Sequence, residues 1–332
     1  MIFQAAAAGP FRYGPAGAPS ETSFGRKAVL LVITLCVAAA PFLLLMPGTR
    51  AVVAAELQPG LIEDAARLNQ SSNAARLEAL QTLLRSRRIN FDVQPFANDR
   101  QARDSRAQGQ NVVITAGSGP RDLIVGAHFD AVALANGSPS EGMVDNAASV
   151  VALMRAAESL AARQLRHRVQ IVFFDMEEIG LLGSRHFAES MDRARVAAMV
   201  NLDIAGYGDT VFAGPSASTG NGTVYDALAH VCARDHRACV VSAAFPTSDD
   251  RSFQAAGTPN VSLAILPALE AHQMWLLMNG GRESGLAADF RPGILRTIHT
   301  AEDRTSRLDA AAMTLAYEMV TALILELDAS LD

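Results

Sequence analysis

The stretch VQIVFFDMEEIG, residues 169–180, is an apolar run that ends in two adjacent carboxylates. Its first half is typical of a strand buried on both faces, as in a parallel sheet covered by helices. Glu177 and Glu178 then stand side by side, and neighbouring carboxylates resist ionising together unless a cation lies beside them. Acids also favour the first turn of a helix, so these residues alone leave a solvated helix start as an alternative.

Outward from this stretch, strand-like and helix-like segments alternate along the chain. Apolar runs predict strands at residues 122–128, 169–175, 197–206 and 259–267. Helical spacing predicts helices at residues 146–165, 183–191, 223–235 and 308–327, and a helical lead at 56–90. This alternation predicts an α/β fold with a mixed, mainly parallel central sheet that is flanked by helices on both faces. A single domain, residues 56–332, accounts for all of these segments.

Residues 28–46 are uncharged and almost wholly apolar, and they are long enough to cross a hydrocarbon core of about 30 Å. Arg26 and Lys27 precede them, so the positive-inside rule predicts that residues 1–27 are cytoplasmic. Small residues at 51–55 leave a cleaved signal peptide open, although the long lead favours an uncleaved anchor. We therefore expect a transmembrane helix and an extracytoplasmic body, either periplasmic or at the cell surface.

The charge of the body argues against nucleic acid as a partner. The whole chain carries −6 and residues 1–55 carry +3, so the remainder carries −9. Phosphate binding needs a basic face, which an acidic body does not supply. Lys27 is the only lysine of the chain, and this excludes Schiff-base or P-loop lysine chemistry in the body.

The body contains two cysteines, Cys232 and Cys239. An oxidising compartment favours a disulfide between them, while two free thiols remain the alternative.

Polar residues follow the predicted strands at the points where those strands end. Each has a local explanation, as a helix cap, a core histidine or a turn residue. Because the carboxyl ends of parallel strands share one edge of a sheet, we expect these residues to lie close together. So much negative charge at a partly buried edge needs a cation, and histidine nitrogen with carboxylate oxygen suits zinc or a related divalent metal. The residues at strand ends are His128, Asp130, Glu177, Glu178 and Asp203; Asp145 directly precedes the long helix at 146–165, and His299 follows another short apolar stretch.

In this order the residues resemble the zinc-dependent aminopeptidases of the M28 family, over roughly residues 110–310. The resemblance implies a zinc exopeptidase-like fold. It lies in five motifs: His-x-Asp at 128–130, Gly-x-x-Asp-Asn at 142–146, Glu-Glu at 177–178, Asn-Leu-Asp at 201–203 and Ile-His-Thr-x-x-Asp at 298–303.

The resemblance also implies a role for each residue. Asp145 bridges two zinc ions, of which one is completed by His128 and Asp203 and the other by Glu178 and His299. Glu177 is the general base, and Asp130 orients the histidine ligand of the first ion.

One departure from the family pattern is Asp250, which stands where relatives commonly have histidine. The family pattern therefore does not indicate how the loop that contains Asp250 contacts the substrate.

The sequence thus predicts a membrane-anchored, metal-dependent aminopeptidase that hydrolyses N-terminal residues from peptides. Two alternatives stay open: acyl transfer on a single zinc, as in glutaminyl cyclases, and a peptidase-like ectodomain that binds without catalysis. The preferred N-terminal residue and the oligomeric state are not indicated by the sequence.

Overall fold

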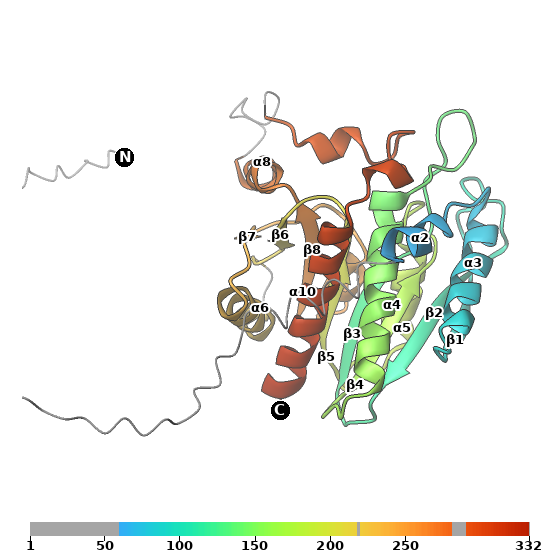
Figure 1. The fold of residues 1–332 in the computed structure, drawn as a ribbon. Coiled ribbons are helices and arrows are strands. Elements are labelled where there is room, and N and C mark those ends of the chain that lie inside the picture. Colours follow the sequence, from blue (N-terminus) through green and yellow to red (C-terminus); the bar gives the residue numbers. More distant parts are fainter. Residues whose placement is uncertain (1–59, 218–219, 281–289, 332) are drawn as a thin grey trace, which may run out of the picture. The chain divides into compact units, whose positions relative to one another are not determined.

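The computed structural model describes residues 60–217, 220–280 and 290–331 (Figure 1). The predicted cytoplasmic segment, residues 1–27, and the predicted transmembrane helix, residues 28–46, lie outside the described residues.

The described residues form an eight-stranded sheet with the strand order β1-β2-β4-β3-β5-β8-β6-β7. The central strands β4, β3, β5 and β8 are parallel, while β2 pairs antiparallel with β4 and β6 pairs antiparallel with β8. The predicted mixed α/β sheet is therefore confirmed. The strands are β1 (Asp92–Ala97), β2 (Gln108–Ala116), β3 (Asp122–His128), β4 (Arg168–Phe174), β5 (Val196–Leu202), β6 (Thr210–Gly214), β7 (Cys239–Val241) and β8 (Asn260–Leu266).

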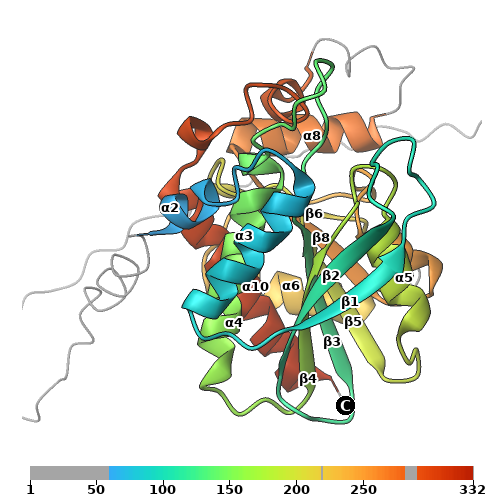
Figure 2. The same ribbon diagram turned by 90° about the vertical axis from the view of Figure 1, so that its right-hand side faces the viewer.

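Helices cover both faces of this sheet (Figures 1 and 2). The longer ones are α2 (Leu61–Ala66), α3 (Asn73–Ser86), α4 (Ala148–Ala161), α5 (Leu182–Ser190), α6 (Gly222–Arg234), α7 (Asp250–Ala255), α8 (Ala268–Asn279) and α10 (Ala310–Ser330). The described residues also contain three short helical turns: η1 (Met143–Ala147), η3 (Gly293–Arg296) and η4 (Thr305–Arg307).

Successive side chains of strand β3 point to opposite faces of the sheet, so they belong to two different parts of the core. Leu123 and Val125 belong to the large apolar core that α4 and α10 share. Ile124 points the other way and packs in a smaller core with Phe187 of α5 and Phe253 of α7. By length and composition α10 is also able to cross a bilayer, yet 56% of its apolar window is buried inside the protein. We therefore interpret α10 as a core helix.

Two features differ from the sequence-based expectation. The helical lead predicted at 56–90 is two helices, because Ser72 interrupts it and caps α3 by accepting the Ala75 N–H at 3.2 Å. The sheet is also wider than predicted, since β1 and β2 flank the polar loop and the short strands β6 and β7 extend the other edge. Strands of three to five residues are too short to give a clear period-2 signal.

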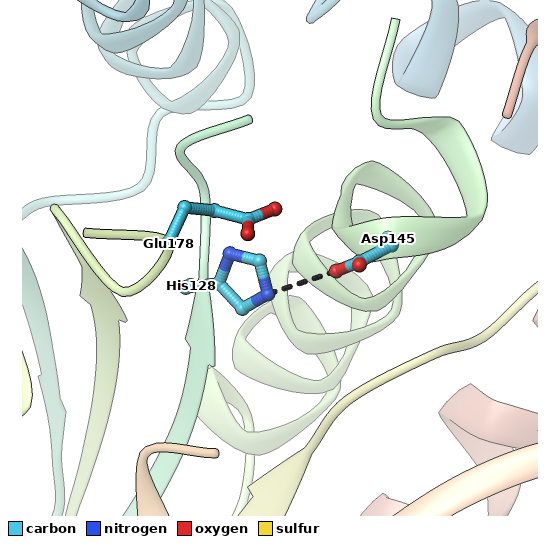
Figure 3. A group of neighbouring side chains, drawn as sticks. All are labelled: His128, Asp145 and Glu178. Carbon is cyan, nitrogen blue, oxygen red and sulfur yellow. Dashed lines mark ion pairs between the residues drawn. The ribbon is translucent and has the colours of Figure 1, made fainter. Parts of the chain in front are cut away.

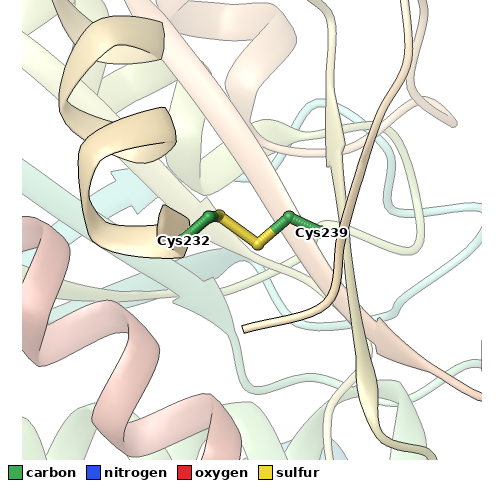
Figure 4. The surroundings of a disulfide bond; sticks show 2 residues. All are labelled: Cys232 and Cys239. Carbon is green, nitrogen blue, oxygen red and sulfur yellow. A yellow bond between two sulfur atoms is a disulfide. The ribbon is translucent and has the colours of Figure 1, made fainter. Parts of the chain in front are cut away.

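Cys232 and Cys239 form a disulfide that ties the end of α6 to the start of β7 (Figure 4). Of the two alternatives that the sequence leaves open, the structure therefore has the disulfide.

Candidate metal centre

The candidate site lies at the carboxyl ends of the central parallel strands. His128 is the last residue of β3, Glu177 and Glu178 follow β4, and Asp203 comes directly after β5. These three strands are neighbours in the sheet, so their ends deliver the side chains to one edge. Asp145 reaches the same place from η1, the turn that leads into α4.

Asp145 lies at the centre of the cluster and is 6% exposed. Its Oδ1 lies 3.0 Å from Nε2 of His128, which in turn lies 3.6 Å from Oδ1 of Asp203. Its Oδ2 lies 3.2 Å from Nε2 of His299, which lies 3.1 Å from Oε2 of Glu178. The five predicted ligands are thus brought together as two halves that share one carboxylate.

The donor atoms of this cluster suit a bound divalent metal. One ligand atom each from His128, Asp145 and Glu178 lies within 4.8 Å of the others (Figure 3). Within the described part of the chain, Glu178 Oε1 and Asp203 Oδ1 are buried and accept no hydrogen bond. Buried oxygens without a partner are costly, and a cation is the group that would satisfy them. Imidazole nitrogen and carboxylate oxygen are both ligands that zinc accepts.

The pKa values of the predicted ligands also indicate a surplus of negative charge in the cluster. Hydrogen bonds to Asp145 and Glu178 raise the pKa of His299 to about 11. Burial lowers the pKa of His128, but its contacts with Asp130, Asp145 and Asp203 outweigh this and raise it well above its usual value. Burial and the charge of Asp145 raise the pKa of Glu178 to about 7. Without a metal the carboxylates therefore hold protons on both histidines, and metal binding would displace those protons.

Asp130 connects the first histidine to the turn that carries the two glutamates. Its Oδ1 accepts the backbone N–H of Glu177 at 3.0 Å and its Oδ2 that of Glu178 at 3.2 Å. His128 Nδ1 lies 3.5 Å from Asp130 Oδ1 and 3.2 Å from its backbone oxygen. The turn begins with Met176, a buried residue with φ of 60° in the left-handed region, so its shape depends on such contacts.

Asp303 holds the segment that carries the central carboxylate. Its side chain accepts backbone N–H groups of Met143 at 3.0 Å, Val144 at 2.6 Å and Asp145 at 3.1 Å. Asn146 links the same segment to the end of β5, because its side chain donates to the backbone oxygen of Leu202 at 3.0 Å, and Leu202 directly precedes Asp203. Asp303 lies in one of the family motifs, but sequence reasoning gave it no role. The separation of 158 residues between Asp303 and Asp145 conceals the contact.

Arg76 is a second residue that sequence reasoning missed. It is 2% exposed and donates to four backbone oxygens. These belong to Phe129, to Leu68 at 3.0 Å, and to Glu141 and Gly142 at 2.6 Å each. Burial lowers the pKa of Arg76 to about 10. Within a helical lead it looks like an ordinary surface arginine, and no local signal marks it as buried.

Asp250, the departure from the family pattern, is fully buried beside Asp249 at the start of α7. Burial raises the pKa of each carboxyl to about 7. Burial, together with the charges of Asp249 and Asp203, also raises the pKa of Glu177 well above its usual value. Sequence reasoning singled out Asp250 and missed its neighbour Asp249, whose charge raises the pKa of Glu177, the predicted base.

Solved structures with the same fold include enzymes of two kinds. BSAP, a zinc aminopeptidase from Bacillus subtilis, has a TM-score of 0.52 at 20% identity and matches 66% of this chain. This chain spans only 50% of that protein's length. The LapA aminopeptidase of Legionella pneumophila has a TM-score of 0.62 at 19% identity, over 85% of this chain and 71% of its own. A Tannerella forsythia glutaminyl cyclase has a TM-score of 0.61 at 18% identity, over 81% of this chain and 97% of its own.

At these identities the likeness shows the fold alone. No curated protein matches the sequence. The model of peptidase family M28 matches residues 111–324, which include every residue of the candidate metal centre. The chain therefore belongs to peptidase family M28.

Proposed function

We propose that this protein is a dinuclear zinc aminopeptidase that removes N-terminal residues from peptides. The observation that carries the proposal is the division around Asp145, whose two oxygens face different histidines at 3.0 and 3.2 Å. A single ion needs no such shared carboxylate, whereas a pair of ions needs a bridge between two ligand sets. His128 and Asp203 would hold one ion, and Glu178 and His299 the other.

Bound zinc ions would polarise the scissile carbonyl and make water a stronger nucleophile near neutral pH. We assign the proton transfer to Glu177. Its neighbour Glu178 turns toward His299, while Asp130 holds the backbone of both glutamates. Glu177 takes a proton from the attacking water and gives it to the leaving nitrogen as the C–N bond breaks. The products are a free amino acid and a peptide that is one residue shorter.

We further propose that residues 28–46 anchor the protein and that its body faces an extracytoplasmic compartment. The Cys232–Cys239 disulfide supports this location, because structural disulfides persist in oxidising compartments. Peptides would be the substrates there. The acidic body continues to argue against nucleic acid.

A glutaminyl cyclase is the second candidate. One observation favours it: this chain covers 97% of the length of the Tannerella forsythia cyclase but only 50% of the length of the Bacillus subtilis aminopeptidase. That activity would convert an N-terminal glutamine into pyroglutamate and release ammonia, with no residue removed.

One experiment separates the candidates. The purified, zinc-loaded chain is incubated with aminoacyl chromogenic substrates and with a peptide that begins with glutamine, and the products are analysed by mass spectrometry. We expect release of the N-terminal residue, loss of that release on chelation, and a fall of about 10²–10⁴-fold in kcat for Glu177→Gln.

Zinc content distinguishes a catalytic defect from a lost site, so the Glu177→Gln variant is expected to retain both ions. Cyclisation without residue release would overturn the aminopeptidase proposal. No reaction with either substrate, together with fewer than one ion per chain, would favour a binding ectodomain.

A further inference from the structure

A cleft of about 420 Å³ opens directly beside the candidate metal centre. Glu178, one of the predicted zinc ligands, forms part of its wall, together with Ile179. The other walls are the start of α3, the loop between β1 and β2, and the segment at 131–139 that follows β3. A peptide whose scissile bond lies at the metals would therefore place a neighbouring group in this cleft, which we call the Glu178 cleft.

The Glu178 cleft combines apolar walls with two arginines. Val132, Pro139 and Ile179 contribute apolar surface, while Arg103 and Arg106 come from the β1–β2 loop. Sites that bind small groups commonly have this composition, in which apolar walls give contact and a few polar groups give orientation.

The two arginines differ in whether their charge is already compensated. Arg106 donates to Asp104 Oδ2 at 2.7 Å and to Asp175 at 2.9 and 3.0 Å. Asp175 is fully buried, so this pairing is part of the fold and the charge of Arg106 serves the loop itself. Arg103 is exposed, and within the described part of the chain its guanidinium has no hydrogen-bond or ion-pair partner.

The acids of the cleft do not compensate Arg103. The side chain of Asp104 accepts three hydrogen bonds from the Arg106 guanidinium, from 2.7 to 3.1 Å. Glu178 pairs through its Oε2 with His299 at 3.1 Å. The body outside residues 1–55 carries a net charge of −9. Against this negative background, the cation of Arg103 beside the cleft has no acidic partner among the described residues.

From this geometry we infer that Arg103 is a specificity-determining residue and that the Glu178 cleft accepts a substrate group carrying a carboxylate. The inference rests on the proposed peptidase function. The carboxylate has three possible sources in a peptide: the C-terminus of a dipeptide, or an acidic side chain on either side of the scissile bond. In each case the guanidinium donates hydrogen bonds to the carboxylate oxygens.

Three pairs of peptides, in each of which one member carries a carboxylate that the other lacks, distinguish these sources. The first pair is Ala-Leu and Ala-Leu-amide. The second pair is Ala-Glu-Ala-amide and Ala-Gln-Ala-amide, and the third is Glu-Ala-Ala-amide and Met-Ala-Ala-amide. The kcat/KM values are measured for the zinc-loaded full chain, for Arg103→Gln and for Arg103→Glu. Arg163→Gln serves as the matched control, because Arg163 is exposed just beyond the end of α4, away from the cleft.

We expect the wild-type chain to prefer the carboxylate member of at least one pair. Arg103→Gln is expected to lower kcat/KM for that member about two- to fivefold, as for a partly exposed ion pair, and to leave the neutral member unchanged. Arg103→Glu should reverse the preference, and high salt should reduce it. Arg163→Gln should change neither member.

The inference is overturned if no pair shows a preference, or if Arg103→Gln affects both members of a pair equally. Binding of the same peptides to the Glu177→Gln variant, measured by calorimetry, makes the same comparison with turnover strongly reduced. A chain that hydrolyses nothing but binds the carboxylate members more tightly would refute the proposed function and support the cleft. A chain that hydrolyses all pairs equally would do the reverse.

Discussion

Replacing Arg76 by methionine should reduce both stability and zinc affinity, although Arg76 belongs to neither of the proposed ligand sets. Its guanidinium connects Phe129, which follows the predicted ligand His128, to Gly142, which begins the turn to Asp145. Methionine fills much of the same volume but donates no hydrogen bond, so the substitution removes the connection and the positive charge together.

The magnitude follows from the carbonyls that lose a donor. The oxygen of Gly142 keeps the N–H of Ala147 at 3.1 Å, which leaves those of Leu68, Phe129 and Glu141 to be satisfied by water or left bare. Each buried polar group without a partner costs about 1–3 kcal/mol. Glu141 lies near solvent, so we expect a total loss of about 3–5 kcal/mol, comparable to breaking a buried charge interaction. At roughly 2–4 °C per kcal/mol, Tm should fall by roughly 6–20 °C.

Zinc affinity distinguishes a positioning role from a general loss of stability. The assay is competition with a chromogenic chelator, well below the Tm of every variant, and we expect the affinity of Arg76→Met to fall about 10–100-fold. The control is Arg87→Met, because Arg87 on the same helical layer pairs with Asp64 and with Glu158 at 3.0 Å, away from the site. Equal zinc affinity in the two variants, at a similar fall in Tm, would refute the reasoning.

Three further predictions concern the shared carboxylate, the disulfide and the buried acid in α7. Asp145→Asn should reduce bound zinc from two ions to at most one by elemental analysis, since an amide bridges poorly; two retained ions would contradict the bridging role. Reduction of the Cys232–Cys239 bond, or its replacement by two serines, should cost about 2.5 kcal/mol in urea unfolding for a separation of 7 residues, and an unchanged midpoint would argue against a stabilising bond. Asp250 has its pKa raised by burial to about 7 in the folded protein, so its contribution is full below its unfolded pKa of about 4 and is lost as pH rises toward 7. As pH rises from about 4 toward 7, the Asp250→Asn variant should therefore gain stability relative to wild type by up to about 1.4 kcal/mol per pH unit. Thermal unfolding of both proteins at several pH values measures this difference, and a difference that stays constant with pH would show that Asp250 does not titrate in that range.

Much of the fold was predictable because its signals are local. The buried run at 169–175 and the apolar runs near it have the length and composition of strands, and the intervening segments have helical spacing. The short strands β6 and β7 and the break at Ser72 were not predictable, because three to five residues carry little periodicity and a serine cap can be read only where a helix is already known to start.

The candidate site also combines features that the sequence predicts with features that only the structure reveals. The sequence by itself determined which residue types follow the strands, and hence the family, the prediction of zinc and the adjacent pair of Glu177 and Glu178. The tertiary structure decided that the two oxygens of Asp145 face different histidines, and it brought Arg76 and Asp303 to the same segment from 66 and 158 residues away. Such contacts depend on how elements pack, and packing brings together side chains whose separation along the chain leaves no local pattern to read.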